Sequence, residues 1–268
     1  MIMFAVFMGL VGLAIGSFAD AVAWRIHSKR NFVTGRSECE HCHHKLAPLD
    51  LIPVLSWVML GGKCRYCEHA ISPVVPLVEL GMGLAFGLSA LYWPFGFDMW
   101  QGNVLFGLWV VYLVVLGILF VYDLRWLLLP DVLVYPLIGL AFVDAAIRVS
   151  VQTQATVTDY AGHVVLGVAA MAGVYALLYM VSRGKWVGFG DVKLAVFVGA
   201  VLGWEKTFVV LMLANVLGLL VIMPGLLSHK LTPKSHVPFG PFMIAAFVLV
   251  GLFGDSIIRW YLLGVVQL

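Results

Sequence analysis

Long apolar stretches constrain this chain more than any other feature of its sequence. Crossing the hydrocarbon core of a bilayer takes about 20 apolar residues, so the chain has room for about eight crossings. The predicted spans are nearly free of charge and cover residues 2–24, 74–93, 103–122, 131–149, 161–181, 191–203, 206–226 and 239–263. The sixth span is short, because only Gly203 and Trp204 separate it from the seventh. We therefore expect an all-α polytopic membrane protein.

The composition supports this fold class and excludes others. Only 11% of the 268 residues are charged and 62% are hydrophobic, whereas soluble domains carry about 25% charged residues. Once the spans are set aside, no basic face remains that would bind nucleic acid. The first apolar run is longer than the core of a usual signal peptide, so we interpret it as a retained helix. The lipid bilayer is thus a predicted partner, and a homodimer is left open.

The distribution of positive charge predicts the orientation of the spans, because Lys and Arg collect in cytoplasmic loops. If the N-terminus lies outside, the cytoplasmic loops hold all but three of the 16 Lys and Arg residues. The three exceptions are Arg148, Lys206 and Arg259. This orientation places the long polar segment after the first span in the cytoplasm.

That polar segment, residues 27–72, is the one connection long enough for a small subdomain, and it carries every cysteine of the chain. The cysteines form two C-x-x-C pairs, which are Cys39 with Cys42 and Cys64 with Cys67. Four thiolates at this spacing suit tetrahedral zinc, and a reducing cytoplasm disfavours disulfides. Since a closed four-thiolate site leaves no position for water, we expect structural zinc that holds an insert too small for a core of its own.

Two other interpretations of the cysteines stay open. In one, they are four independent buried residues without a metal. In the other, a histidine replaces one thiolate, and the candidates are His41, His43, His44 and His69. In either case the chain divides into a first transmembrane helix (1–26), the tetracysteine insert (27–72) and a larger transmembrane domain (73–268).

Two acids stand at the mouths of predicted spans, on the same side of the bilayer. Asp123 ends one apolar run, and Asp191 follows Gly188 and Gly190 just before another. An ionisable group at membrane depth is costly and therefore marks a functional site by default. Because glycine has no Cβ, the two glycines let another backbone, such as that of an extended substrate, approach Asp191 closely.

Two interpretations of these acids compete. In a catalytic dyad, the two carboxyls share a proton, so that the charged one activates water and the neutral one donates to the scissile carbonyl. As structural residues, the acids would each pair with a nearby cation, Arg125 or Lys193. We rank Asp131, which follows Pro130 and can cap a helix, and Lys193 as helpers of a catalytic pair.

Glu79 is a further acid inside a predicted span, just beyond the cysteine insert. It either binds a cationic ligand, such as a cofactor, or pairs with a group on a neighbouring helix. We keep it as a candidate cofactor-binding residue.

Taken in order, the motifs of this chain resemble those of the type IV prepilin peptidases, also called prepilin leader peptidase/N-methyltransferases. Each motif alone is weak, but the ordered set covers nearly the full chain and is highly specific. The matching motifs are Gly16-Ser17-Phe18 with Trp24-Arg25, Cys39-x-x-Cys42, Asp50-Leu51-Ile52-Pro53-Val54-Leu55-Ser56-Trp57, Gly62-Lys63-Cys64-Arg65-Tyr66-Cys67, Ile71-Ser72, Pro76-Leu77-Val78-Glu79-Leu80, Asp123 with Leu129-Pro130-Asp131, Gly188-x-Gly190-Asp191-Val192-Lys193, and Pro238-Phe239-Gly240-Pro241.

This resemblance implies a GxGD-type aspartic endopeptidase of the bacterial inner membrane. Asp123 and Asp191 match the family's catalytic pair, and the four cysteines match its zinc ligands. Such enzymes remove the short basic leader of type IV prepilins and type II secretion pseudopilins at the cytoplasmic face, cutting after a glycine. Many then methylate the new N-terminal amine with S-adenosylmethionine. The resemblance associates residues 27–72 with methylation and assigns the peptidase to 73–268.

Three positions depart from the family pattern. Asp20 and Leu51 stand where asparagine is usual, and Val134 stands where threonine is frequent. The first two lie in the half associated with methylation, so a peptidase that does not methylate is one alternative function. A non-enzymatic ion channel or transporter that uses the two acids as an ion path is the other. Transporters tend to have repeated halves, however, and the halves of this chain are dissimilar.

Overall fold

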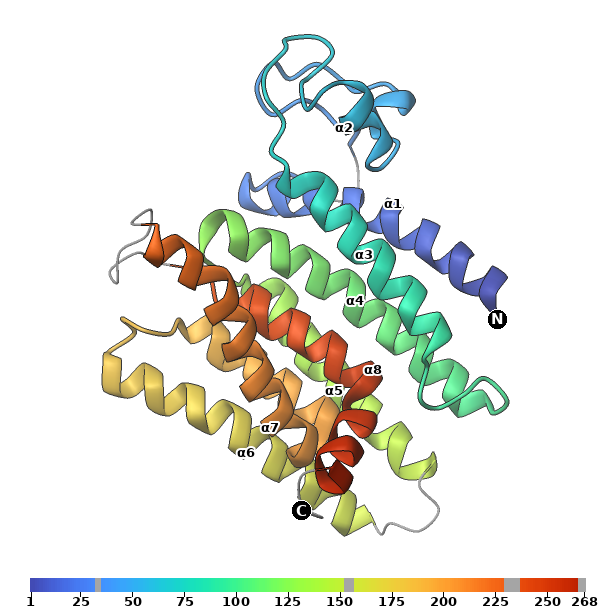
Figure 1. Cartoon of the computed structure of the whole chain (residues 1–268), viewed down its shortest axis with the longest axis vertical. Helices are drawn as coiled ribbons and strands as arrows, with labels where there is room; N and C mark the ends of the chain where they lie inside the picture. The colour runs from blue at the N-terminus through green and yellow to red at the C-terminus, as the bar shows by residue number, and fades with distance from the viewer. Residues whose placement is uncertain (32–34, 152–156, 229–236, 265–268) are drawn as a thin grey trace. The chain divides into compact units, whose positions relative to one another are not determined.

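The computed structural model describes residues 1–31, 35–151, 157–228 and 237–264, and every named element in this part of the chain is a helix. The elements are α1 (Ile2–His27), the 3-10 helix η1 (Pro48–Leu51), α2 (Leu55–Met59), α3 (Val74–Leu91), α4 (Trp100–Trp126), α5 (Asp131–Val151), α6 (Val157–Ser182), α7 (Phe189–Leu227) and α8 (Gly240–Gly264) (Figure 1). Within the described residues, seven helices are long and apolar enough to cross a membrane. The prediction of an all-α, multi-span protein is confirmed.

Helix α7 holds both the sixth and the seventh predicted spans. Its 39 residues would extend about 58 Å as one straight helix, nearly twice the hydrocarbon thickness of about 30 Å. At Gly203 the backbone leaves the helical region (φ 73°, ψ 177°) and divides α7 into two arms. The second arm begins near the far part of α8, where Lys206 pairs with Asp255, and returns towards the start of α8, where Gly218 faces Phe242. The predicted break is therefore present, and the sixth and seventh predicted spans lie within one element.

The first of two compact units comprises Met1–Trp93 and Val110–Tyr122. In this unit α1 packs along α3 (Figure 1). A Cβ atom added at Gly12 would lie 2.5 Å from a backbone oxygen of α3, and one at Gly16 would lie 2.6 Å from the Cα of Glu79. Glycine at these positions thus lets the two helix backbones approach, as small residues do at membrane helix contacts.

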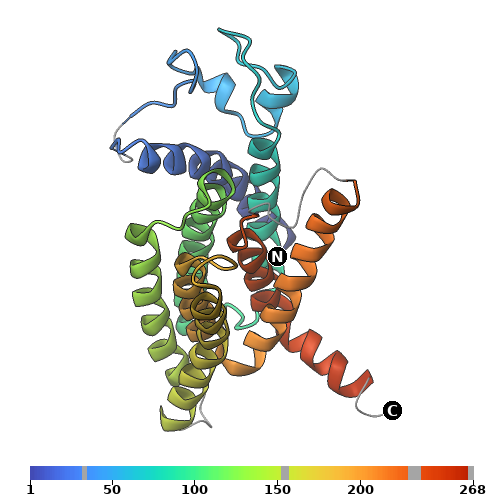
Figure 2. The same cartoon turned by 90° about the vertical axis from the view of Figure 1, so that its left-hand side faces the viewer.

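The cysteine insert belongs to the first unit and joins α1 to α3 (Figure 2). Isolated β-bridges close its two cysteine loops by pairing Glu38 with Lys45 and Lys63 with Ala70. Trp57 of α2 donates its Nε1–H to the carbonyl oxygen of Ile71 at 3.1 Å. This bond fastens α2 to the segment that leads into α3.

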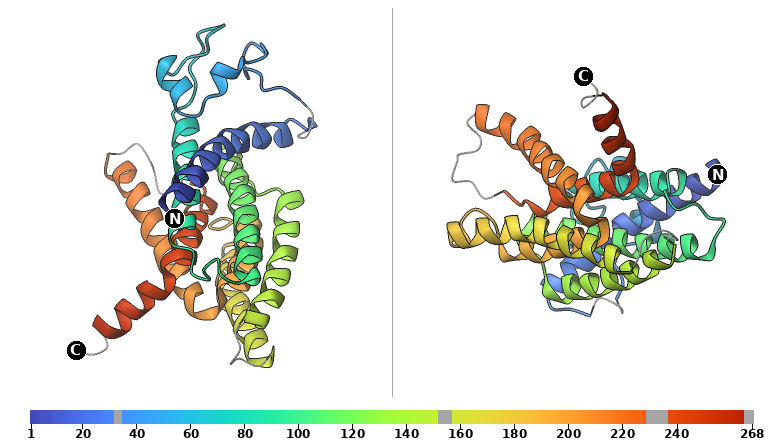
Figure 3. Two further views of the ribbon diagram at one scale, coloured as in Figure 1. Left: turned by 90° about the vertical axis from the view of Figure 1, so that its right-hand side faces the viewer. Right: turned by 90° about the horizontal axis from the view of Figure 1, so that it is seen from below.

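The second compact unit comprises Pro94–Trp109 and Asp123–Leu268, so α4 contributes residues to both units. In the second unit α6 packs along α7 (Figure 3), and α7 also contacts α5 and α8. The buried ring of Phe247 in α8 lies 5.3 Å from that of Trp109 in α4 and 5.0 Å from that of Phe197 in α7. This aromatic cluster joins three elements in the core of the unit.

Many large apolar side chains on the spans are exposed, among them Leu84 at 65% and Met212 at 74%. Such exposure is unfavourable in water, whereas in a bilayer these side chains face lipid tails that are equally apolar. The exposure therefore agrees with a membrane location. The division into residues 1–26, 27–72 and 73–268 stays a prediction.

The contact between α6 and α7 generates a test of the packing. A Cβ at Gly167 would lie 2.5 Å from the carbonyl oxygen of Gly199 and 2.8 Å from the backbone of Gly203. We predict that Gly167→Ala destabilises the protein by about 1–3 kcal/mol, the usual cost of overpacking. The measurement is unfolding in detergent, followed by tryptophan fluorescence.

The matched control for this prediction lies in the same helix. A Cβ at Gly173 meets no atom within 4 Å, so Gly173→Ala should be neutral or stabilise by up to about 1 kcal/mol through helix propensity. Equal effects of the two substitutions would show that the α6–α7 backbone contact is not as close as described.

Candidate active site and metal centre

Asp123 lies in the last turn of α4, which ends at Trp126. The helix stops because Leu127 adopts a left-handed conformation (φ 55°) while its N–H still bonds to the Asp123 carbonyl oxygen at 2.9 Å. This is an αL cap. The Asp123 residue is only 5% exposed, so α4 presents a buried carboxyl at its C-terminal end.

Asp191 is placed by the start of α7. Gly188 is the N-cap residue, and its N–H donates to Asp191 Oδ2 at 3.2 Å. A helix N-terminus is a favourable place for a carboxylate, since the unpaired N–H groups and the helix dipole both attract negative charge. A Cβ at Gly190 would lie 3.0 Å from the Cβ of Leu129, so this glycine lets the first turn of α7 pack closely on the segment before α5.

The two carboxyl groups are close enough for the charge of Asp191 to act on Asp123. The start of α8 completes the arrangement: the amide of Gly240 interacts with the Asp123 carboxyl, and a Cβ at Gly240 would lie 2.6 Å from Asp123 Oδ2. Within the part of the chain that the structure describes, Asp123 Oδ2 is buried without a hydrogen-bond partner. One helix C-terminus and two helix N-termini thus surround a pair of acids with an unused acceptor.

The predicted helpers Asp131 and Lys193 form an ion pair with each other. Lys193 is 13% exposed, and its ammonium lies 5.4 Å from the ring centroids of both Tyr135 and Phe189. Asp131, the first residue of α5, therefore provides the counter-charge for Lys193. The alternative in which Lys193 neutralises Asp191 receives no support from these contacts.

Sequence reasoning assigned no site role to Gly240 or Tyr175, which both lie at this site. The motif Pro238-Phe239-Gly240-Pro241 is part of the ordered set that resembles the family, and its glycine is the sequence signal for this position. The hydroxyl of Tyr175 is buried and lies close enough to Asp191 for an electrostatic interaction between them. Tyr175 lies inside α6 and belongs to none of the sequence motifs. It reaches the site through helix packing, which the local sequence does not indicate.

The four cysteine sulfurs form a single cluster, in which all four atoms lie within 4.8 Å of one another. Cys39 and Cys67, which come from different loops, are 3.9 Å apart. Zn–S bonds of about 2.3 Å would place the sulfurs of a tetrahedral site about 3.8 Å apart. The donor set and spacing therefore fit a structural metal ion, and within the described residues the cluster consists of cysteines alone.

The two cysteine loops have the same local construction. The N–H of Cys39 bonds to the carbonyl oxygen of His44 at 3.0 Å, and the N–H of Cys64 bonds to that of His69 at 2.9 Å. The residue after each second cysteine, His43 or Glu68, has φ 56°. Each loop thus turns back through a left-handed residue, and the pair of loops presents four sulfurs to one point.

The sulfurs differ in their tendency to ionise. Burial raises the pKa of Cys39, but hydrogen bonds from the amides of Cys42 and His41 outweigh it and lower the pKa to about 7. For Cys67, the amide of His69 lowers the pKa, whereas burial and the neighbouring sulfurs raise it to about 12. Cys39 therefore ionises more readily than Cys67, and a bound cation would favour the thiolate form that metal ligation requires.

Asp50 of η1 braces the second cysteine loop. Its carboxylate accepts a hydrogen bond from Arg65 Nε at 2.7 Å, from the Ala47 N–H at 3.1 Å and from the Tyr66 hydroxyl at 3.3 Å. Burial raises the pKa of Asp50, but these bonds and the charge of Arg65 outweigh it, so the net pKa is lowered. The interaction therefore stabilises the insert above the ordinary pKa of an aspartate and is lost as the pH falls through the lowered value.

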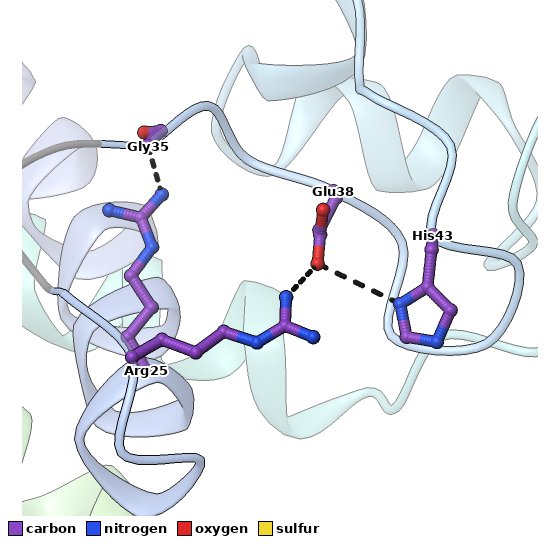
Figure 4. A network of polar contacts seen from close by, with 5 residues as sticks. Arg25, Gly35, Glu38 and His43 are labelled. Carbon is purple, nitrogen blue, oxygen red and sulfur yellow. Dashed lines mark hydrogen bonds and ion pairs between the residues drawn. The ribbon is translucent and has the colours of Figure 1, made fainter.

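The first cysteine loop is tied to the end of α1. Figure 4 shows Arg25 pointing to the carbonyl oxygen of Gly35, at 3.0 Å, and Glu38 lying beside His43, at 3.7 Å. Glu38 also pairs with Arg30, which follows α1. These contacts connect the loop of Cys39 and Cys42 to the membrane helix that precedes it.

Glu79 fastens the insert to α3. Its Oε2 accepts the N–H of Val54 at 2.6 Å, and the Ser17 hydroxyl of α1 also bonds to the carboxyl. Val54 has φ 63° and ψ −50°, and the N–H of Leu55 bonds to the carbonyl oxygen of Pro53 at 2.6 Å, which defines the strained form of a γ-turn. A β-branched residue in this region is unfavourable, so the bond to Glu79 helps to hold a strained turn. The role of Glu79 in cofactor binding stays a prediction.

The four-thiol site generates a second test. We predict that Cys39→Ser lowers the zinc content of the purified protein and destabilises the insert, since one thiolate ligand is lost. The measurements are metal content by mass spectrometry and hydrogen exchange of residues 35–72. Ser37→Ala, two residues away and outside the cluster, should leave both unchanged. Full zinc content in the Cys39→Ser protein would contradict a four-thiolate site.

Fold and site together define a class of protein: a multi-span helical membrane protein with a pair of interacting carboxyl groups, one of them buried, and a four-thiol cluster. Comparison with known families gives two matches. Residues 10–93 match the Bacterial Peptidase A24 N-terminal domain, and residues 110–223 match the Type IV leader peptidase family. No solved structure matches the chain.

Relatives from several bacteria carry the name prepilin leader peptidase/N-methyltransferase. The protein from Stutzerimonas stutzeri is 31% identical over 94% of this chain and 92% of its own length. The protein from Bacillus subtilis strain 168 is 31% identical over 94% of this chain and 96% of its own, and the one from Aeromonas hydrophila is 35% identical over 87% and 76%. This chain therefore belongs to the type IV leader peptidase family, as its motifs predicted.

Proposed function

We propose that this protein is an aspartic endopeptidase of the bacterial inner membrane that removes the basic leader of type IV prepilins or type II secretion pseudopilins, and that methylates the new N-terminus. Membership of the type IV leader peptidase family and the names of its relatives support this activity. The observation that carries the peptidase is the pairing of Asp123 with Asp191, two acids that lie 68 residues apart in sequence and interact at converging helix ends.

In the proposed reaction, one carboxylate of the pair takes a proton from a water molecule, whose oxygen attacks the carbonyl carbon of the last residue of the leader. The other carboxyl, held protonated because two close carboxylates resist ionising together, donates its proton to the carbonyl oxygen. The carboxyl that took the proton from water then passes it to the leaving amine as the C–N bond breaks, and the new hydroxyl group returns its proton to the other carboxylate. Asp191 suits the role of the charged partner, because it lies at a helix N-terminus and accepts the Gly188 N–H. Asp123, with an unpaired Oδ2, suits the role of the proton donor.

The substrate chemistry agrees with the position of the acids along the helices. A prepilin carries a short basic leader followed by an apolar helix, so that helix can lie in the bilayer while the cleavage point emerges at its surface. Asp123 ends one predicted span, and Asp191 begins another. The bias of Lys and Arg favours a cytoplasmic location for this side and an outside location for the N-terminus.

The methyl donor is S-adenosylmethionine in this proposal. The chain has no soluble-type glycine-rich nucleotide loop, so the donor site would be built from the insert and the nearby ends of α1 and α3. The acid Glu79 lies in that region and suits a cationic sulfonium or amine. Zinc, held by the four cysteines, would supply no chemistry, since a closed site has no open position. It would keep the insert folded.

The carboxylate pair gives the decisive test. We predict that Asp123→Asn and Asp191→Asn each abolish leader cleavage, because neither variant can complete both proton transfers. Since Asn has nearly the same size as Asp, both variants should fold, with thermal unfolding in detergent close to that of the unaltered protein. The measurement is the intact mass of a purified prepilin after incubation with each variant.

Asp98→Asn is the matched control, since Asp98 precedes the start of α4, whereas Asp123 lies in the last turn of that helix. Full cleavage by either Asp123→Asn or Asp191→Asn would rule out the dyad.

Adding S-adenosylmethionine to the same assay separates the alternative functions. A product heavier by one methyl group supports both activities, and an unmodified product supports a peptidase alone. Ion flux without any cleavage would support the transport alternative.

A further inference from the structure

The site contains a second buried polar atom without a partner. Among the residues that the structure describes, four buried side-chain polar atoms lack a hydrogen bond, and they belong to Gln101, Asp123, Asp144 and Tyr175. Leaving such a group unpaired costs about 1–3 kcal/mol, so each one needs an explanation, and catalysis is among those explanations. Two of the four, Asp123 Oδ2 and the Tyr175 hydroxyl, lie at the proposed peptidase site.

Packing of α6 places Tyr175 against the start of α8. Its ring centroid lies 5.6 Å from that of Phe239, and Phe239 directly precedes Gly240, the glycine that contacts the Asp123 carboxyl. The side chain of Tyr175 is almost fully buried, with 2% of the residue exposed. Tyr175 is therefore held at the same helix end that packs on Asp123.

The next turn of α6 packs against the start of α7. The ring of Tyr179 lies 5.5 Å from that of Phe189, the first residue of α7 and the second before Asp191. Tyr175 and Tyr179 are four residues apart, so they lie on one face of α6. The hydroxyl of Tyr175 is also close enough to Asp191 for the charge to act on it. Asp191 thus lies near an O–H group that has no hydrogen-bond partner among the described residues.

We infer that Tyr175 is a third catalytic residue of the peptidase, whose hydroxyl donates a hydrogen bond to the carbonyl oxygen of the scissile peptide as that oxygen becomes negative. This inference rests on the proposed peptidase function. The two carboxyls move protons: one accepts a proton from water, and the other supplies one to the carbonyl oxygen. That oxygen has two lone pairs, so as its negative charge develops it can accept a second hydrogen bond from a donor that keeps its own proton.

A phenol meets this requirement, because its ordinary pKa of about 10 lets it donate a hydrogen bond without transferring the proton at neutral pH. The inference also explains the unpaired state of Tyr175, since the partner would be present only during the reaction. A purely structural role explains it less well. The ring contact with Phe239 needs no hydroxyl, and phenylalanine would make it without burying an unpaired O–H.

The test is the substitution Tyr175→Phe, assayed with a purified prepilin in detergent or nanodiscs. We expect kcat for cleavage to fall about 100-fold, which is typical for loss of one oxyanion donor, with KM nearly unchanged. Because the substitution removes a buried hydroxyl that has no partner, the Tm of the free protein should stay the same or rise. Methylation of a prepilin that has already been cleaved should be unaffected.

Tyr179→Phe is the matched control, since it makes the same chemical change one turn away and keeps the ring contact with Phe189. It should leave kcat, KM and Tm close to those of the unaltered protein. An unchanged kcat in Tyr175→Phe would overturn the inference, and so would a lower kcat accompanied by a lower Tm or by an equal loss of methylation. These results are separate from failure of the proposed function, which would be seen as cleavage by Asp123→Asn or Asp191→Asn.

Discussion

The structure depends on holding two carboxyl groups close together at the edge of apolar helices. Desolvation and like-charge repulsion both make this arrangement unfavourable. Helix termini at the site offset this unfavourable free energy. Asp191 lies in the first turn of α7 and accepts the Gly188 N–H, while the first residue of α8, Gly240, packs on Asp123. These termini supply backbone N–H groups and positive dipole ends where the membrane supplies none.

Close helix packing is what brings these termini together. Gly167 and Gly199 let the backbones of α6 and α7 meet, and Gly240 leaves room for the Asp123 carboxyl. A methyl group at any of the three would clash with its neighbour. The same packing brings Tyr175 of α6 to the site. The positions of the two acids and of the residues around them therefore depend on the same helix contacts.

The cysteine insert follows a different principle, since it is too small to depend on a hydrophobic core. Its two loops share one turn geometry and present four sulfurs to a single point. The bond from Val54 to Glu79 fastens the insert to α3, and the pair of Asp50 with Arg65 braces the second loop. Glu79, which the sequence alone suggested as a ligand for a cation, is thus also a structural anchor.

The sequence by itself determined the fold class, the break at Gly203, the four-thiol cluster and the family, because apolar length, cysteine spacing and ordered motifs are local properties of the chain. Only the tertiary structure decided that Lys193 pairs with Asp131, that Gly240 packs on Asp123 and that Tyr175 faces the same site. Those contacts join residues that are far apart in the chain. Their geometry depends on how closely the helices pack, and no local pattern encodes that distance.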